Sequence, residues 1–405
     1  MDLEIKSTEE GRKPKRNLEK RIADLKRRFT EFFKNPKKRL LFIIISGVVL
    51  IALFAIGFYF LTHEDYQIFP DKDPLIDEEE DAEVLYEAIL DGVMTDADSA
   101  SKHPLAIMVE NHTQARPQSG LIKASVVYEA IAEGGITRFM GVFGTNEAEI
   151  VGPVRSARPY YVDWAEGYDA YYAHVGGNAT ALDQIRADAV LDLNQFSYTA
   201  PYWRDRSLNV SSEHTMFTST SKLRIQANEN GYSTANNFNK YKFKDDPEKG
   251  TNEALSLPQT QKISVDISSY NYNVYFEYDK ENNCYKRFMA NKSHNDRTSG
   301  DQITPKNIAI MTVNRAPHTT RINENGWLMD TVGTGDATIF VDGKEISGSW
   351  KKSSKSDREI FYDQDGKEII FNRGQLWITV IPPGSSFLVE TTPAADIETD
   401  TFGNE

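Results

Sequence analysis

The chain has 405 residues, and its 46 Lys and Arg against 60 Asp and Glu give a formal net charge of −14. This acidic balance argues against nucleic acid as a partner, because nucleic-acid binding requires a basic surface. Its single cysteine, Cys284, excludes an intramolecular disulfide. HExxH, CxxC, GxSxG and P-loop patterns do not occur, so we predict neither a metal site nor a cofactor.

The N-terminal residues predict a membrane anchor. Residues 1–39 carry 14 Lys and Arg against 7 Asp and Glu, and the 22 residues 40–61 carry no charge. As a helix this run would span roughly 33 Å, enough to cross a hydrocarbon core of ~30 Å. The positive-inside rule then predicts a cytoplasmic tail, a single transmembrane helix in the cell membrane, and an extracytoplasmic remainder. An extracytoplasmic chain without disulfides is typical of a Gram-positive envelope.

An acidic segment follows the apolar run. Residues 62–103 contain 14 Asp and Glu against 2 Lys and are poor in aromatic side chains. This composition predicts a mostly disordered spacer, with one short helix around 84–90, that holds the globular part away from the membrane.

The two parts of the globular region differ in their content of Arg and Lys. Residues 105–225 contain eight Arg and two Lys, whereas residues 226–405 contain six Arg and fourteen Lys. Because Arg suits partly buried bidentate contacts and Lys suits solvated surfaces, we predict two domains, 104–255 and 256–392, before a tail at 393–405.

Hydrophobic patterns and turn signals give the fold class, α+β with an α/β first domain. The first domain should contain a mixed sheet, with strands at 105–109, 125–133, 136–143 and 169–175 and helices at 159–167 and 179–188. The second should be mostly β, with strands at 262–267, 274–278, 307–313, 337–341, 359–362 and 375–381.

A glycine pair between two of these strands predicts a two-residue hairpin. In that register Arg138 lies opposite Ile131 and diagonal to Glu129 and Glu133. We therefore expect an internal ion network here in preference to a general acid and base pair, whose two glutamates would be ~13 Å apart along an extended strand.

The sequence GPVRSARP, residues 152–159, predicts an anion site. A helix should begin at Pro159, because proline is favoured at the first helical position. Arg155 and Arg158 would then enter a helix N-terminus whose free N–H groups attract phosphates and carboxylates. The alternative is that both arginines pair with nearby acids such as Asp163 and Glu166.

A second junction between a strand and a helix lies at residues 174–180, HVGGNAT. Gly176 and Gly177 permit close approach of the backbone, Asn178 can cap the helix, and His174 would lie at the carboxyl end of its strand. Ligands of α/β sheets favour such edges. The alternative is a glycine turn beside a core histidine.

Other polar residues could complete such a site. Arg116 and Arg138 are expected near the two junctions. Secondary candidates of acid, base and cation type are Glu110, Asn111, Glu129, Glu133, Arg204, Arg206 and His214. They do not have the spacing of a known catalytic motif, so no catalytic residue is assigned.

Long stretches of the chain resemble one bacterial family. PLAIMVENHTQARPQSGLIKASVVYEAIAEGGITRFMGVF, GPVRSARPYYVDWA, YYAHVGGN, GTGDATIFVDGKEISGSWKK and GQLWITVIP are similar to the YerB-like lipoproteins, a family of unknown function. The resemblance covers most of residues 104–383 and implies a two-domain envelope protein without an established enzyme activity. The chain departs from the family's usual lipid anchor because it has no N-terminal cysteine.

Three functions remain open. The first is binding of an anionic envelope precursor or polymer fragment through the arginines at the two junctions. The second is an enzyme of envelope metabolism that uses Glu110 with His174 or His214 as acid and base. The third is a membrane-tethered scaffold, with Trp327, Trp350 and Trp377 as an exposed patch for a protein partner whose identity the sequence does not indicate. The alternative for these three tryptophans is packing in the core of the β domain.

Overall fold

The computed structural model describes residues 84–394, together with 36–37, 40, 44–47, 50, 52, 54 and 55. Contacts within the chain separate residues 1–82 from residues 83–405, and the second unit holds all the strands described below. Most of the predicted tail 1–39, the first part of the spacer at 62–83, and the end of the C-terminal tail lie outside the described residues.

The predicted transmembrane helix at 40–61 is contradicted. In the parts of the chain that the structure describes, no helix has both the length and the apolar character needed to cross a membrane. The fold class is therefore corrected to an α+β fold, mostly sheet, without the transmembrane element.

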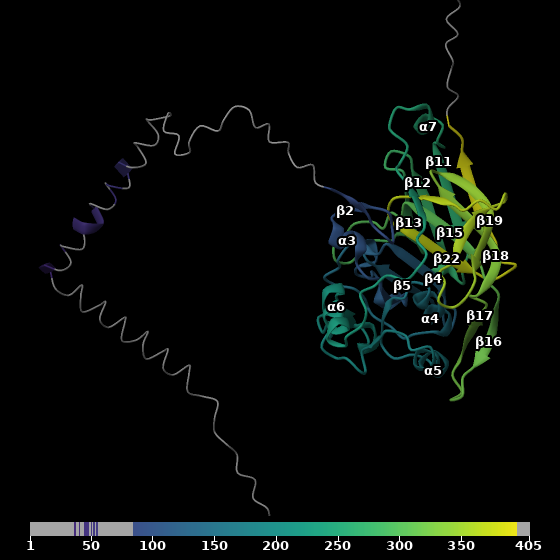
Figure 1. The fold of residues 1–405 in the computed structure, drawn as a ribbon, viewed down its shortest axis with the longest axis horizontal. Coiled ribbons are helices and arrows are strands. Elements are labelled where there is room, and N and C mark those ends of the chain that lie inside the picture. The colour runs from purple at the N-terminus through teal and green to yellow at the C-terminus, as the bar shows by residue number, and fades with distance from the viewer. Residues whose placement is uncertain are drawn as a thin grey trace, which may run out of the picture. The chain divides into compact units, whose positions relative to one another are not determined.

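A ten-stranded mixed sheet forms the centre of the described fold (Figure 1). In spatial order its strands are β20 (Ile360–Asp363), β19 (Lys344–Lys352), β18 (Gly333–Val341), β15 (Asn307–Thr312), β22 (Leu376–Ile381), β4 (Val126–Ile131), β5 (Thr137–Phe143), β3 (Leu105–Glu110), β6 (Tyr171–His174) and β7 (Asp192–Asn194). The pairs β15–β22, β22–β4, β3–β6 and β6–β7 are parallel, and the other pairs are antiparallel.

Strands from both predicted domains share this sheet. β22 lies between β15 and β4, with Leu376 opposite Val126, so the sheet continues from residues of 256–392 into residues of 104–255. β3, β4, β5 and β22 are buried along their whole length. Such strands read as continuous apolar runs because both of their faces are covered.

The structure describes five helices in residues 84–394, and two of them, α4 and α5, begin where the sequence predicts. The helices are α3 (Ala97–Ser101), α4 (Pro159–Glu166), α5 (Ala179–Ala187), α6 (Thr220–Glu229) and α7 (Asn252–Leu255), and the 3-10 turns are η1 (Thr113–Ala115), η2 (Leu121–Lys123), η3 (Ser212–His214) and η4 (Tyr270–Tyr272). α4 has proline at its first position, and Asn178 caps α5 by accepting a bond from the Ala181 amide at 2.9 Å. Both local predictions are confirmed.

A second sheet packs on the face of the central sheet that is opposite to α4. It is antiparallel and contains β14 (Lys292–Ser293), β13 (Cys284–Met289), β12 (Val274–Asp279), β11 (Thr260–Val265) and β23 (Phe387–Thr392). Its inward side chains, including Phe276, join Phe139 and Trp377 in one hydrophobic cluster, whereas Trp164 of α4 lies in another. The two clusters cover the opposite faces of the central sheet.

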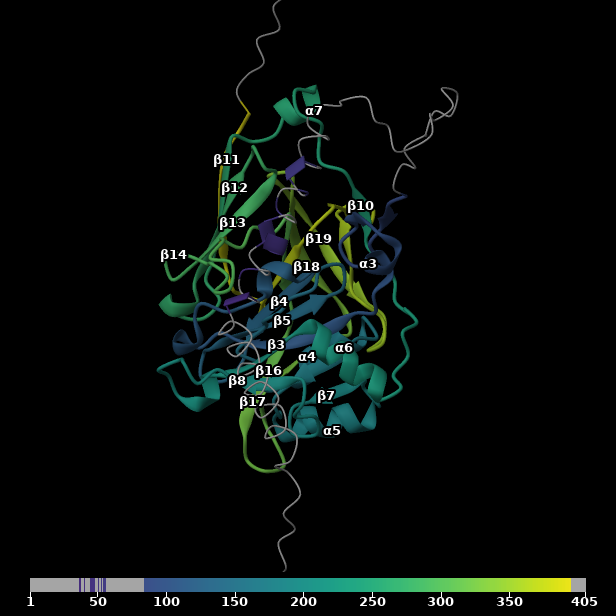
Figure 2. The same ribbon diagram turned by 90° about the vertical axis from the view of Figure 1, so that its left-hand side faces the viewer.

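Four two-stranded ribbons complete the fold. They pair β1 (Tyr86–Glu87) with β2 (Met94–Thr95), β8 (Tyr202–Arg204) with β9 (Met216–Thr218), β10 (Lys242–Lys244) with β21 (Ile370–Asn372), and β16 (Arg315–Thr319) with β17 (Asn325–Met329). The hairpin β16–β17 projects beside α5 (Figures 1 and 2).

The last part of the predicted spacer belongs to the globular unit. Residues 84–103 form β1, β2 and α3 in place of a disordered segment with a helix around 84–90. Leu90 is buried, and the buried carboxylate of Asp91 accepts bonds from the hydroxyls of Ser125 at 2.6 Å and Thr145 at 2.8 Å. Composition alone does not predict these contacts, because Ser125 and Thr145 lie far from Asp91 along the chain.

The register of the β4–β5 hairpin differs from the prediction by one residue. Ile131 pairs with Thr137, and Ala130 pairs with Arg138. A shift of one residue exchanges the faces of a strand, so Arg138 lies on the face opposite to Glu129. The predicted ion network therefore divides into two separate clusters.

Candidate functional site

The two predicted junctions lie side by side. Ala157 forms a parallel bridge with Gly177, and its amide donates to the Gly176 carbonyl at 2.9 Å. The Val175 amide donates to the Arg155 carbonyl at 3.0 Å. The loops that enter α4 and α5 are therefore joined through their backbones.

Arg155 is held between two carboxylates. Its Nε lies 3.0 Å from Glu110 Oε1, and its Nη2 lies 3.1 Å from Glu213 Oε2. The second oxygen of Glu110 lies 2.8 Å from His214 Nδ1, and both of these side chains are 4 % exposed. The His112 ring stacks on that of His214 with centroids 4.7 Å apart. The structure thus joins two secondary candidates, Glu110 and His214, to one of the principal ones.

Arg158 and Arg138 share a different carboxylate, Glu133. Arg158 Nε forms a hydrogen-bonded ion pair with Glu133 Oε1, and Arg138 Nη2 lies 3.6 Å from Glu133 Oε2. Burial and the nearby charge of Arg158 lower the pKa of Arg138 to about 10, which still leaves it charged at neutral pH. The acids that neutralise Arg155 and Arg158 are therefore glutamates from distant strands and loops, in place of the suggested Asp163 and Glu166.

The N-terminus of α5 already carries a carboxylate. Glu324, from the turn of the hairpin β16–β17, accepts a hydrogen bond from the Ala179 amide at 2.9 Å. His318 of the same hairpin lies 2.9 Å from the Thr180 hydroxyl. Sequence analysis missed this hairpin, because neither β16 nor β17 shows an alternating apolar pattern.

His174 is a buried structural residue. Its Nδ1 lies 2.7 Å from the Gly176 carbonyl oxygen and its Nε2 lies 2.8 Å from Asp192 Oδ1. Both ring nitrogens are therefore engaged within the fold. This arrangement matches the alternative of a core histidine beside a glycine turn.

A closed ring of buried polar groups lies between the central sheet and the five-stranded sheet. We call Glu129, Thr137, Asn111, Gln118, His294 and Arg287 the buried polar ring. Arg287 Nη2 lies 2.6 Å from Glu129 Oε2, and both side chains have no exposed surface. Burial and the charges of Arg287 and Arg116 hold the pKa of His294 well below its usual value. The His294 imidazole is therefore neutral, and its Nδ1 accepts a hydrogen bond from Arg287.

Arg116 connects this ring to a cavity. Its Nε donates to Asn111 Oδ1 at 3.0 Å and its Nη2 donates to the Asn111 carbonyl at 3.1 Å. Its guanidinium lies 5.0 Å from the centre of the Tyr272 ring. The cavity has a volume of about 720 Å³, and we call it the Arg116 cavity. It is lined by Thr113, Arg116, Pro117, Tyr270, Asn271, Met289, Ala290, Lys292, Ser293, His294 and Asn295.

Comparison with known proteins identifies the family of the chain. Residues 90–233 match the family model described as "Protein of unknown function (DUF3048) N-terminal domain", and residues 263–378 match the corresponding C-terminal domain. The chain is 32 % identical over 299 residues to "Putative lipoprotein YerB" of Bacillus subtilis (strain 168), covering 73 % of this chain and 86 % of that protein. The chain belongs to the YerB-like family.

A solved structure agrees with this assignment. The crystal structure of the YerB protein from Bacillus subtilis superposes with a TM-score of 0.66 at 29 % identity, covering 75 % of this chain and 99 % of that one. The buried polar ring joins the two matched domains. Glu129 lies within the N-terminal match, and its ion-pair partner Arg287 lies within the C-terminal match. The resemblance inferred from the sequence motifs is confirmed.

The remaining candidates are more exposed. Arg204 Nη1 donates to the Ser212 carbonyl, and both Arg204 and Arg206 are exposed.

Trp350 and Trp377 are buried, 2 % and 0 % exposed, so the aromatic patch of the scaffold hypothesis does not form from the three tryptophans. Across residues 84–394 and the shorter described stretches, no group of three or more His, Cys, Asp or Glu could hold a metal ion.

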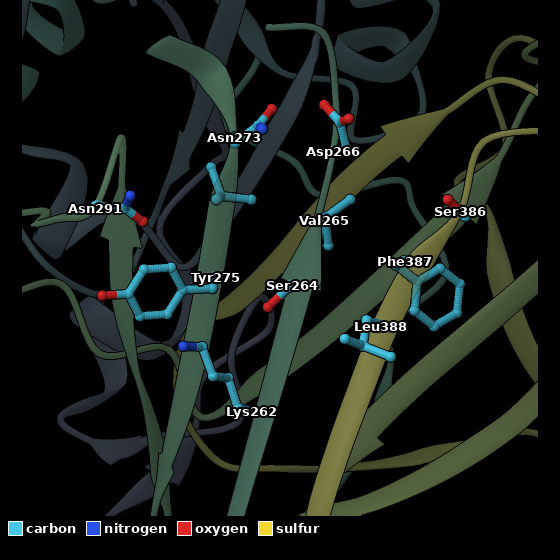
Figure 3. A pocket seen from close by; sticks show the side chains of 11 residues that line it. Lys262, Ser264, Val265, Asp266, Asn273, Tyr275, Asn291, Ser386, Phe387 and Leu388 are labelled. Carbon is cyan, nitrogen blue, oxygen red and sulfur yellow. The ribbon is translucent and has the colours of Figure 1, made fainter. Parts of the chain in front are cut away.

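A further hollow lies on the outer face of the five-stranded sheet. Its volume is about 530 Å³, and its lining includes Lys262, Asp266, Tyr275 and Leu388 (Figure 3). The Lys262 ammonium lies 4.3 Å from the centre of the Tyr275 ring. Because both charge signs line it, this hollow lacks the cationic character of the Arg116 cavity.

Proposed function

We propose that this protein is an extracytoplasmic cell-envelope protein that binds an anionic ligand, with the Arg116 cavity as its site. The relative in Bacillus subtilis carries the name "Putative lipoprotein YerB", which supports an envelope location. The positive charge of the cavity lining supports an anionic ligand class. A phosphorylated envelope precursor or a fragment of an anionic polymer has the required chemistry.

The observation that carries the proposal is the sign of the lining residues. Arg116 and Lys292 line the cavity of about 720 Å³, and no carboxylate does so. The chain as a whole has a net charge of −14, so a cavity whose charged lining residues are both cations runs against the charge balance of the chain. Arg116 has three N–H donors left after its two bonds to Asn111, and the amides and hydroxyls of the lining can supply more.

Arg116 is also held in a defined position. The two bonds to Asn111 and the Tyr272 ring restrict its guanidinium, and Asn111 is itself fixed because its amide donates to Thr137 Oγ1 at 2.7 Å. A preorganised cation loses less conformational freedom when a ligand binds. Lys292, in contrast, is exposed and supplies the second positive charge of the lining.

The test uses the full-length protein, inorganic pyrophosphate as the probe, and isothermal titration calorimetry. Lys292→Gln should weaken pyrophosphate binding at least tenfold, because it removes one of two cations without disturbing the Arg116 contacts. Lys344→Gln, at an exposed lysine outside the cavity, makes the same charge change and should bind as the wild type does. Equal affinity in all three proteins would exclude this cavity as the anion site.

A second function, catalysis, is favoured by one contact. Glu110 Oε2 lies 2.8 Å from His214 Nδ1, which orients the ring and leaves Nε2 for a substrate proton. Nε2 lies 3.8 Å from Glu213 Oε1, an exposed carboxylate that a ligand could displace. Glu110 and His214 would act as the orienting carboxylate and the general base.

This second function is tested with His214→Asn and isolated envelope fractions, with products detected by mass spectrometry. Catalysis would be supported by a product that the wild type forms and His214→Asn does not, provided that the wild type and His214→Asn bind pyrophosphate equally. Identical product profiles for the wild type, His214→Asn and a reaction without protein would reject it.

A further inference from the structure

The tip of the hairpin β16–β17 occupies the N-terminus of α5 with a carboxylate of the chain itself. Three polar contacts join the two elements: Glu324 with the Ala179 amide, His318 with the Thr180 hydroxyl, and Arg321 with Asp183 at 2.8 Å. Figures 1 and 2 both show the hairpin beside α5. None of the residues in these contacts lines the Arg116 cavity.

We propose that the junction of α4 and α5 is a second anion site, in which the Glu324 carboxylate takes the place of a phosphate group. A phosphate-bearing ligand would displace Glu324, bind the amide end of α5 beside Arg158 and Arg138, and release the tip of the hairpin. This proposal is independent of ligand binding in the Arg116 cavity.

The helix end supplies the first part of the argument. α5 is nine residues long, and the amide of its first residue, Ala179, donates to the Glu324 carboxylate. The free N–H groups and the dipole of such a helix favour negative charge. Since a carboxylate already binds there, the position accepts an anion.

A buried donor without a partner supplies the second part. The Asn178 side chain is 4 % exposed, and its Oδ1 caps α5, but its Nδ2 has no hydrogen-bond partner. A Cβ placed on Gly326 would lie 3.6 Å from this Nδ2 and 3.9 Å from Glu133 Oε1. The amide therefore faces the hairpin, near the ion pair of Glu133 with Arg158. Buried amide groups are normally paired, so an additional acceptor would complete this position.

The local charges supply the third part. Two guanidiniums, Arg138 and Arg158, share one carboxylate, Glu133, and the positive end of α5 is matched by Glu324. A phosphate group carries about −1.5 to −2 charge at pH 7 and three strong acceptor oxygens, which exceeds what one carboxylate can offer. It could bond to the Ala179 amide, Asn178 Nδ2 and Arg158 together.

The hairpin is attached in a way that permits its tip to separate. β16 and β17 pair only with each other in the described sheets, and most of their side chains are exposed or half-buried. Ile322, at the tip, is 57 % exposed. The tip is thus held to α5 mainly by the three polar contacts, whereas Trp327 and Met329 anchor the base of the hairpin against the core.

The experiment compares the full-length wild type with Glu324→Gln, using inorganic phosphate as the probe and chloride as the control anion. Glu324→Gln removes the charge of the competing group, so phosphate should bind at least tenfold more tightly than it does to the wild type. Glu345→Gln, at an exposed glutamate in β19, is the matched control and should leave phosphate affinity unchanged. Phosphate, but not chloride, should increase amide hydrogen exchange in residues 320–324 of the wild type.

Two further variants keep the proposal falsifiable. Arg158→Ala in the Glu324→Gln protein should abolish the gain, and Arg158→Lys should retain part of it because it retains the charge. Equal phosphate affinity in the wild type and Glu324→Gln would overturn the proposal, as would a gain that survives Arg158→Ala. Lys292→Gln should not alter the effect of Glu324→Gln, which separates this site from the Arg116 cavity.

Discussion

The ion pair between Glu129 and Arg287 allows a quantitative prediction about stability. Both side chains are fully buried, and the pair closes the buried polar ring at a separation of 2.6 Å. Removing one partner of such a pair leaves an uncompensated charge in the interior, which typically costs about 3–5 kcal/mol. Arg287 also lies 4.3 Å from the centre of the Trp377 ring, so its loss removes a desolvated cation–π contact as well. We therefore expect Arg287→Met to lower the free energy of unfolding by about 4 kcal/mol.

Urea unfolding followed by tryptophan fluorescence measures this change, and a double-mutant cycle separates the pair from its surroundings. Glu129→Gln with Arg287→Met should cost at least about 1.5 kcal/mol less than the sum of the two single changes, because neither buried charge then remains. The surface pair of Arg321 with Asp183, 63 % and 43 % exposed, is the control, and Arg321→Met should cost at most about 1 kcal/mol. Strictly additive costs, or a loss below about 1 kcal/mol for Arg287→Met, would refute the reasoning.

Two other changes test different parts of the fold. Burial and the charge of Asp188 raise the pKa of Glu166 to about 7, above its usual value. The folded state therefore binds this proton more tightly than the unfolded state does, and stability should fall as pH rises from about 4.5 to 7. Glu166→Gln should remove that decline and stabilise the protein at pH 8 by about 1 kcal/mol, after discounting for partial exposure, as measured by urea unfolding; an unchanged pH profile would contradict the assignment. Gly348→Ala would place its Cβ against the Tyr362 carbonyl oxygen across the β19–β20 pair, closer than van der Waals contact allows, so it should cost about 3 kcal/mol, whereas Ser347→Ala should cost less than about 1 kcal/mol. Equal thermal stability of these two variants would refute this packing argument.

Local chemistry made several elements predictable. Proline at the first position of α4 and the Asn178 cap of α5 depend on residues within one turn, so the sequence contains all the information needed. The strands β3 and β15 were recognisable for a similar reason, because their buried apolar runs are short and bounded by turn residues. The family motifs followed from the same local segments.

The membership of each ion pair was not predictable in this way. Glu129 and Arg287 are 158 positions apart, and the Ala179 amide meets Glu324 across 145 positions. Their pairing depends on how two sheets and a hairpin pack. The β4–β5 turn shows the same limit at short range, because one extra loop residue moved Arg138 to the other face of the sheet.

The sequence by itself determined the family, the acidic balance, the starts of α4 and α5, and the position of Arg158 at the start of α4. Each of these properties is local or compositional. Only the tertiary structure decided that Arg155 and Arg158 are neutralised by glutamates, that Arg116 lines a cavity free of carboxylates, and that Glu324 covers α5. The physical reason is that electrostatic partners are selected by distance in space, which the packing of distant segments sets.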